Sequence, residues 1–184
     1  MNAEFTNPTS ASSVLMTPAV EPITDELLIA DPTTRPVGVP VGIPGAPLST
    51  TGWYGKLPAA GDFLNRRLPD EFREPWDRWL SQGMMYAKDK LAEQWESTFL
   101  SFSVWRFLWI SAQDKEPIWL GILMPGIDRV GRLFPLTVAM PFSRDLFTHL
   151  SIDSLDTRLD LLQDLALRVL EDDDLERFDS ALRA

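Results

Sequence analysis

Residues 104–110 and 118–124 are two runs of β-branched and aromatic side chains, separated by a short polar connection. Such side chains favour extended strands, because they pack well on a pleated surface. A short connection joins neighbouring strands in antiparallel fashion, since parallel strands need a long crossover. The two runs therefore predict an antiparallel hairpin.

Shorter runs at 53–57 and 134–140 predict two further strands. Helical periodicity, with apolar residues three and four apart, recurs in the stretches between and after them. Proline suits the first position of a helix and serine caps one, so we expect helices to begin near Pro75 and Ser154. Further helical stretches are expected at 88–100 and after the acidic run at 171–174. The prediction is an α+β fold, with an antiparallel sheet flanked by helices in a single domain.

A chain of 184 residues is long enough for one domain with a substantial core. Seven tryptophans support such a core, because wide aromatic side chains bury large areas. We divide the chain into an α+β core at 51–142 and acidic helices at 143–184 that complete or flank it.

Residues 1–50 hold eight of the fifteen prolines and a single aromatic side chain. Such a segment buries too little apolar surface to offset the entropy of ordering it. The prediction is a disordered, proline-rich tail and linker. The alternative is a short docking motif that folds on a partner, for which residues 24–30 offer a brief helical pattern.

The net charge is −10, and the excess acidic residues lie in 1–50 and 143–184. Nucleic-acid binding needs clustered basic residues, so an acidic chain argues against it. No stretch is apolar for long enough to span a bilayer, and no basic and apolar leader is visible at the N-terminus. We expect a cytoplasmic protein with no direct membrane insertion.

The chain contains no cysteine and one histidine, His149. Thiolate chemistry and cysteine-ligated metals are therefore excluded. The glycines match no phosphate-binding pattern. No cofactor and no metal site are expected.

Two loops, 58–69 and 125–132, combine glycine with opposite charges. Arginine presents a planar fork that recognises carboxylates or phosphates, so one hypothesis is a partner-binding or anion-binding surface. The other is a polar staple in which aspartates hold the arginines in place, since paired charges are weak evidence of function. The residues involved in either hypothesis are Asp62, Arg66, Asp128, Arg129 and Arg132.

A third hypothesis makes Asp62 and Asp128 a catalytic pair of a hydrolase-type enzyme. Acid–base catalysis requires two carboxyl groups whose pKa values are driven apart. Nearby arginines would lower both pKa values, which suits ion pairing better than proton donation. We therefore expect a protein that is not an enzyme.

Seven segments follow one another in the order WYGKLPAAGDFL (53–64), RLP (67–69), PWDRWL (75–80), WRF (105–107), WLGILMP (119–125), DRVGR (128–132) and FPLT (134–137). In this order and at this spacing they resemble the TagF family of type VI secretion-associated proteins. The resemblance covers roughly residues 52–142. Gly126 is a departure, since the family pattern leads us to expect serine there, and the C-terminal part is shorter than in fuller relatives.

The resemblance implies a bacterial accessory protein of type VI secretion with a longin-like α+β domain. It also implies post-translational, negative regulation through binding of a forkhead-associated scaffold protein. The family suggests no catalytic residue. A structural adaptor that supports the secretion apparatus stays open as an alternative, because the sequence does not give the sign of the effect.

Overall fold

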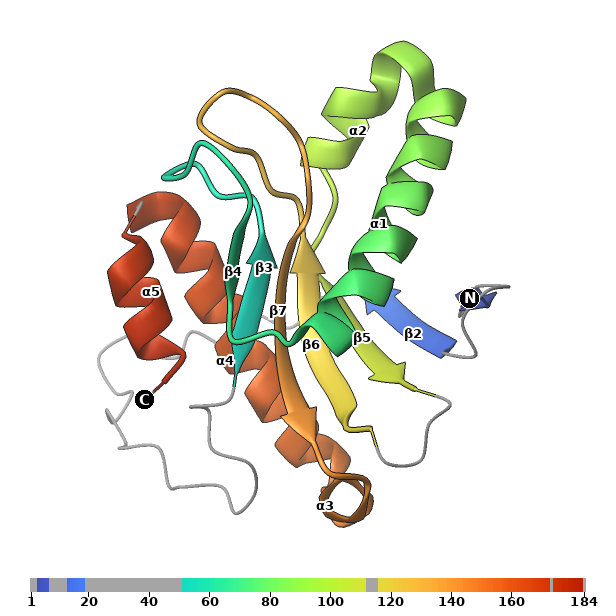
Figure 1. The fold of residues 1–184 in the computed structure, drawn as a ribbon, viewed down its shortest axis with the longest axis vertical. Coiled ribbons are helices and arrows are strands. Elements are labelled where there is room, and N and C mark those ends of the chain that lie inside the picture. Colours follow the sequence, from blue (N-terminus) through green and yellow to red (C-terminus); the bar gives the residue numbers. More distant parts are fainter. Residues whose placement is uncertain (1–2, 7–12, 19–50, 112–115, 173, 184) are drawn as a thin grey trace, which may run out of the picture.

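A computed structural model describes residues 3–6, 13–18, 51–111, 116–172 and 174–183. Their strands form one antiparallel sheet in the order β1-β2-β5-β6-β7-β3-β4 (Figure 1). The strands are β1 (Ala3–Thr6), β2 (Ser13–Pro18), β3 (Gly52–Gly55), β4 (Leu64–Arg66), β5 (Trp105–Ile110), β6 (Ile118–Met124) and β7 (Leu136–Phe142).

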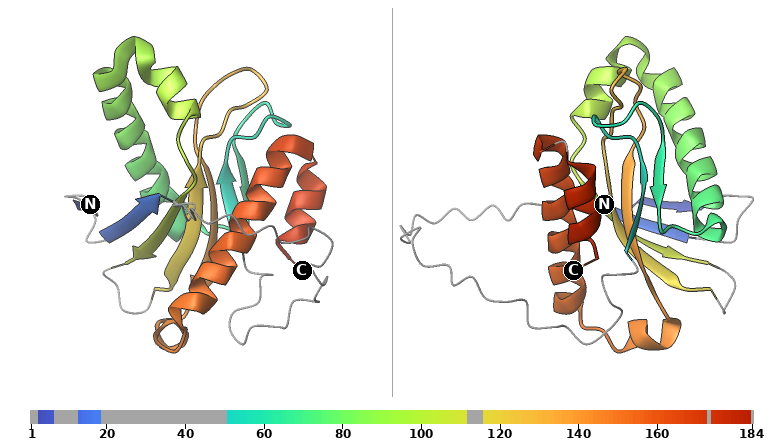
Figure 2. Two further views of the ribbon diagram at one scale, coloured as in Figure 1. Left: turned by 180° about the vertical axis from the view of Figure 1, so that it is seen from behind. Right: turned by 60° about the vertical axis from the view of Figure 1, so that its left-hand side comes forward.

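Helices cover both faces of the sheet, with α1 and α2 on one side and α4 and α5 on the other (Figure 2). The predicted α+β class and the single domain are confirmed. In the described part of the chain, no helix is long and apolar enough to cross a bilayer. The helices are α1 (Asp70–Leu91), the 3₁₀ turn η2 (Ala92–Gln94), α2 (Trp95–Leu100), α3 (Arg144–Thr148), α4 (Ile152–Asp172) and α5 (Leu175–Ala181).

Because both faces are covered, the sheet separates two hydrophobic cores. Neighbouring residues of β7 supply one each: Val138 lies in the core beneath α4 and α5, and Ala139 in the core beneath α1. This is the two-residue alternation of a strand. In the α1 core, Trp76 stacks on Phe107 with ring centroids 4.4 Å apart, and its indole N–H donates to the Thr137 hydroxyl over 2.8 Å.

Gly121, in the middle of β6, lets the α1 core pack this closely. A Cβ atom at residue 121 would lie 2.3 Å from the Val138 carbonyl oxygen and 2.7 Å from the Phe107 ring. Both distances are shorter than any van der Waals contact. Only glycine therefore allows Phe107 to lie flat against the sheet beneath Trp76.

Asp179 joins α5 to the start of the sheet. Its carboxylate accepts hydrogen bonds from the Trp53 indole at 3.0 Å, from Arg67 at 2.6 Å and from Arg183 at 2.6 Å. Burial opposes ionisation, but these three donors outweigh it and hold the pKa of Asp179 below its usual range. Asp174 caps the same helix through the Arg177 N–H, whereas Glu171 and Asp172, which the sequence placed at the start of this helix, still belong to α4.

Residues 3–6 and 13–18 depart from the predicted disordered tail. They form strands, and β2 pairs with β5 from Ser13 opposite Ile110 to Pro18 opposite Trp105. The physical reason lies in β5, whose edge would otherwise present a row of unpaired backbone groups. The remainder of 1–50, with the helical pattern at 24–30, lies outside the described residues.

Several elements differ from the sequence prediction in their limits. Helix α1 begins at Asp70, five residues before Pro75, because Asp70 and Glu71 favour the positive end of the helix and Phe72 is already buried. Gly83 does not interrupt α1. Within the predicted loop 58–69, residues 64–66 add the short edge strand β4.

Two leucines of α4 test the importance of the core beneath it. Leu162 is fully buried, whereas Leu167 is 40% exposed. Leu162→Ala is expected to lower the free energy of unfolding by about 2–5 kcal/mol, and Leu167→Ala by less than about 1 kcal/mol. Urea denaturation followed by tryptophan fluorescence measures both. Equal losses for the two variants would contradict this placement of α4.

Candidate functional site

The two charged loops lie side by side at one end of the sheet (Figure 1). The first follows β3, and the second connects β6 to β7. The backbone N–H of Arg129 donates to the Ala60 carbonyl at 2.9 Å, and the Arg132 guanidinium donates to the Gly61 carbonyl at 2.5 Å. We call the exposed residues of this end the loop surface: Asp62, Phe63, Arg129, Val130 and Arg132.

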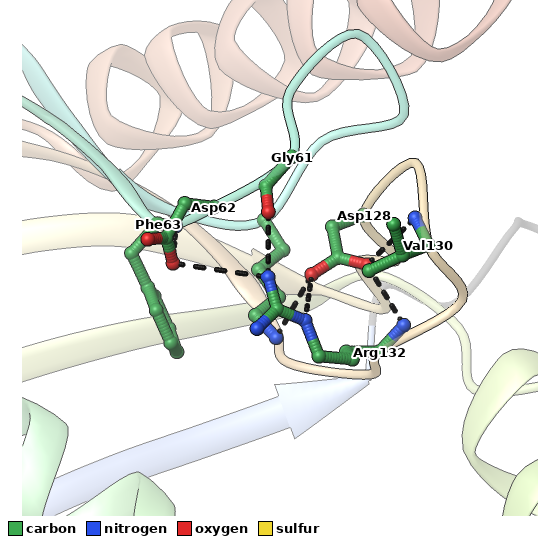
Figure 3. A network of polar contacts seen from close by, with 7 residues as sticks. Gly61, Asp62, Phe63, Asp128, Val130 and Arg132 are labelled. Carbon is green, nitrogen blue, oxygen red and sulfur yellow. Dashed lines mark hydrogen bonds and ion pairs between the residues drawn. The ribbon is translucent and has the colours of Figure 1, made fainter.

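Asp128 organises the second loop from inside (Figure 3). Its side chain is inaccessible to solvent, and one carboxylate oxygen accepts the backbone N–H groups of Val130 at 3.1 Å and Arg132 at 2.8 Å. The other oxygen lies 2.7 Å from Arg132 Nε and 3.1 Å from Lys56 Nζ. Four donors thus fix this carboxylate, and through it the path of residues 128–132.

The same contacts determine the ionisation of Asp128. Burial on its own would raise the pKa, because it disfavours the charged form. The Arg132 N–H, the Lys56 ammonium, the Arg132 guanidinium and the Val130 N–H together outweigh burial. They hold the pKa of Asp128 well below its usual range. The carboxylate is therefore ionised at neutral pH and is poorly suited to donating a proton.

Lys56 is a member of this site that the sequence analysis missed. It is 5% exposed, it pairs with Asp128, and its ammonium lies 4.8 Å from the centre of the Phe63 ring. A buried lysine requires an anionic partner, because desolvation of an ammonium is costly. That partner is far away in the sequence, so the residues around Lys56 did not predict the ion pair.

Phe63 connects the loop surface to the core. Its ring stacks on Tyr54 at 5.6 Å and meets Phe134 edge-on at 4.7 Å. The Tyr54 hydroxyl in turn donates to Asp77 of α1 at 2.6 Å. Burial, followed by this hydrogen bond, raises the pKa of Tyr54 above its usual value. Through these contacts the loop surface packs against aromatic side chains of the core.

Asp62 and Arg66 stand outside this buried network. The Asp62 side chain is 82% exposed and lies 3.9 Å from Arg132 at its nearest. Its carboxylate accepts the N–H of Phe63. Arg66 projects from β4, where it donates to the Asn65 carbonyl and lies 5.9 Å from the Trp53 ring. In the described part of the chain, Arg66 has no hydrogen bond or ion pair with Asp62 or Asp128.

Arg129 and Val130 form the outermost part of the second loop. Val130 is 66% exposed, and Arg129 is exposed as well. Among the described residues, no hydrogen bond or ion pair engages the Arg129 guanidinium. Gly61 leaves it room, since a Cβ atom there would come within 3.3 Å of this group. A cation and an apolar side chain are thus presented on a backbone that Asp128 fixes.

The described residues contain no cluster of acidic or histidine side chains that could hold a metal ion. The arrangement combines a saturated, buried ion network with an exposed rim. The rim presents charged and apolar side chains together.

Comparison with known proteins identifies the family. The sequence model of the TagF N-terminal domain, described as Type VI secretion system-associated, matches residues 52–184. The chain belongs to the TagF N-terminal domain family. The matched region includes α4 and α5, so it extends beyond the segments 52–142 that carried the resemblance.

A solved structure, PA0076 from Pseudomonas aeruginosa PAO1 at 2.05 Å resolution, is similar to this chain, with 37% sequence identity and a TM-score of 0.60. The similarity covers 72% of this chain and 60% of that one, so this chain spans less than two thirds of its length. No curated protein sequence matches the chain.

The ion network makes a pH-dependent prediction. Because its folded-state pKa is lowered, Asp128 contributes stability above the unfolded-state pKa of about 4 and loses it as pH falls towards the folded-state value. Asp128→Asn should therefore lower the urea midpoint most at pH 7, with a difference from wild type that shrinks below about pH 4. The exposed Asp62→Asn is the matched control and should unfold as wild type does. A constant difference across pH would show that Asp128 contributes packing alone.

Proposed function

We propose that this protein is a cytoplasmic accessory factor of type VI secretion that works by binding a partner protein and has no catalytic activity. The partner is the forkhead-associated scaffold protein of the system. Binding restrains secretion after the components have been made. Family membership supports the secretion context, and the loop surface supports the mode of action.

The observation that carries this proposal is that the side chains of Arg129 and Val130 are exposed on a backbone that is held in place. Binding costs less when the binding surface is already ordered, because few side chains and loops lose freedom on association. Asp128 orders the second loop from within, and Phe134, just after that loop, packs edge-on against Phe63. Arginine is enriched among the residues that dominate interface energies.

The geometry offers little to the enzyme hypothesis. A catalytic pair needs one carboxyl group that can donate a proton near neutral pH. Asp128 has four donors and a lowered pKa, and the Asp62 side chain is 82% exposed. A role in partner binding accommodates both residues without such demands.

Charge reversal at Arg129 tests the binding surface. In the full chain, Arg129→Glu should weaken binding to the purified scaffold by at least about tenfold, because a cation at the interface becomes an anion. Arg78→Glu, on the exposed face of α1, is the matched control and should bind as wild type does. Isothermal titration calorimetry measures affinity, and near-ultraviolet circular dichroism checks the fold. Unchanged affinity for Arg129→Glu would remove the loop surface from the proposal.

Arg132 is a poorer choice for this test. Its guanidinium contacts Asp128 and the Gly61 carbonyl, so a charge reversal there would disturb the loop as well as the surface. Val130→Asp makes a second, independent variant, since Val130 is exposed and its backbone N–H contact to Asp128 survives the change.

The sign of the effect is tested in the host bacterium. Deleting the gene should increase the release of type VI substrates into the medium, and a copy carrying Arg129→Glu should fail to restore the restraint. A fall in release on deletion would instead indicate a structural adaptor that supports the apparatus.

A further inference from the structure

The sheet of the family region has two edge strands, which differ in how well they are protected against pairing with another strand. Within residues 52–184 the strand order is β5-β6-β7-β3-β4, so β5 and β4 are the two edge strands. Edge strands expose backbone N–H and C=O groups that can pair with another chain, and proteins commonly block them with charge, proline, bulges or short length.

The β4 edge is protected in this way. It is three residues long, and both Asn65 and Arg66 are exposed on it. Few backbone groups are available there, and a charged side chain stands beside them. A second strand would gain little from pairing with β4.

The β5 edge has none of these protections. It is six residues long, contains no proline, and carries a single charge, Arg106. The Arg106 guanidinium is drawn onto α4, where it pairs with Asp156 at 3.4 Å and with Asp160 at a shorter distance. The charged group therefore contacts the neighbouring helix and does not hinder another strand from pairing with β5. Strand β5 is consequently a template for another strand.

In this chain, residues from outside the family region occupy that template. Strand β2 pairs with β5 over all six positions, including Val14 opposite Trp109, Leu15 opposite Leu108 and Met16 opposite Phe107 (Figure 1). The segment Ser13–Pro18 is uncharged, and its only proline stands at the end of the strand. It shows what kind of segment fits: extended, uncharged and apolar in the middle.

We propose that the β5 edge is a strand-acceptor site, that residues 13–18 occupy it in the resting chain, and that an extended, uncharged segment of a partner protein binds there once they are released. This is β-augmentation, in which main-chain hydrogen bonds supply the affinity. The site is separate from the loop surface and does not depend on the identity of the scaffold.

Competition between the resident strand and a free peptide tests the proposal. A strand within the same chain competes at an effective concentration of about millimolar, so micromolar peptide should not displace it. Leu15→Pro in the full chain should release it, because proline lacks the backbone N–H and is not tolerated inside a paired strand. The probe is a fluorescent peptide of residues 11–20, and binding is measured by fluorescence anisotropy.

The Leu15→Pro chain should bind this peptide at least about tenfold more tightly than wild type does. Two matched controls accompany it. The chain variant Val20→Pro, which lies beyond β2, should behave as wild type does, and a peptide carrying the Leu15→Pro change should bind neither chain. Equal peptide affinity for the wild-type and Leu15→Pro chains would overturn the proposal, and so would a Leu15→Pro chain that dimerises and leaves the peptide unbound.

A disulfide provides a second measurement that does not require the peptide. Leu15→Cys and Leu108→Cys stand directly opposite each other, and opposed residues of antiparallel strands are close enough for a disulfide. The chain has no other cysteine, so only this bond can form within one molecule. Oxidation should give a cross-linked monomer that migrates faster than the reduced chain on a non-reducing denaturing gel, and reduction should abolish this difference. Failure to cross-link would show that β2 does not rest on β5.

Discussion

Burial of the central strands on both faces is the constraint on which this structure depends. Strands β6 and β7 supply side chains to two cores at once, so helices must cover both sides of the sheet. That requirement explains why α1 and α4 lie on opposite faces. It also explains Gly121, since two layers of large aromatic side chains meet on one side of β6. The loops at the end of the sheet inherit their positions from this packing.

The charged loops show how a buried polar network can order an exposed surface. Asp128 is buried and fully engaged, so its role is to fix the backbone that carries Arg129 and Val130. Removing one member of a buried ion pair is costly, because the other charge is left without a partner. Lys56 and Asp128 form such a pair, so each buried charge requires the other.

Local patterns predicted those elements whose neighbours impose little on them. The strand 118–124 was predicted with its observed limits, because its run of apolar residues ends at a turn on either side. The strand predicted at 134–140 begins two residues later in the structure. The N–H of Phe134 closes the loop onto Gly126, and Pro135 has no N–H to contribute to a ladder. The start of this strand was therefore decided by a contact between residues that are distant in the sequence.

The candidate site was predicted in part for the same reason. Asp128 and Arg132 are four residues apart, so their pairing follows from the loop sequence. Lys56 and Gly61 reach them only once β3 stands beside β7, which no local pattern reveals. The pairing of β2 with β5 was missed because a proline-rich composition says little about a single short segment within it.

Arg67 connects the two ends of the family region. It holds a left-handed backbone conformation, with φ of 61°, just before α1. Its guanidinium donates to the carbonyl of Thr51 and to the carboxylate of Asp179. One side chain thus ties the residue that enters the domain to the helix near its exit. The start of the first strand of the family region and its last helix are therefore held together by one charged side chain.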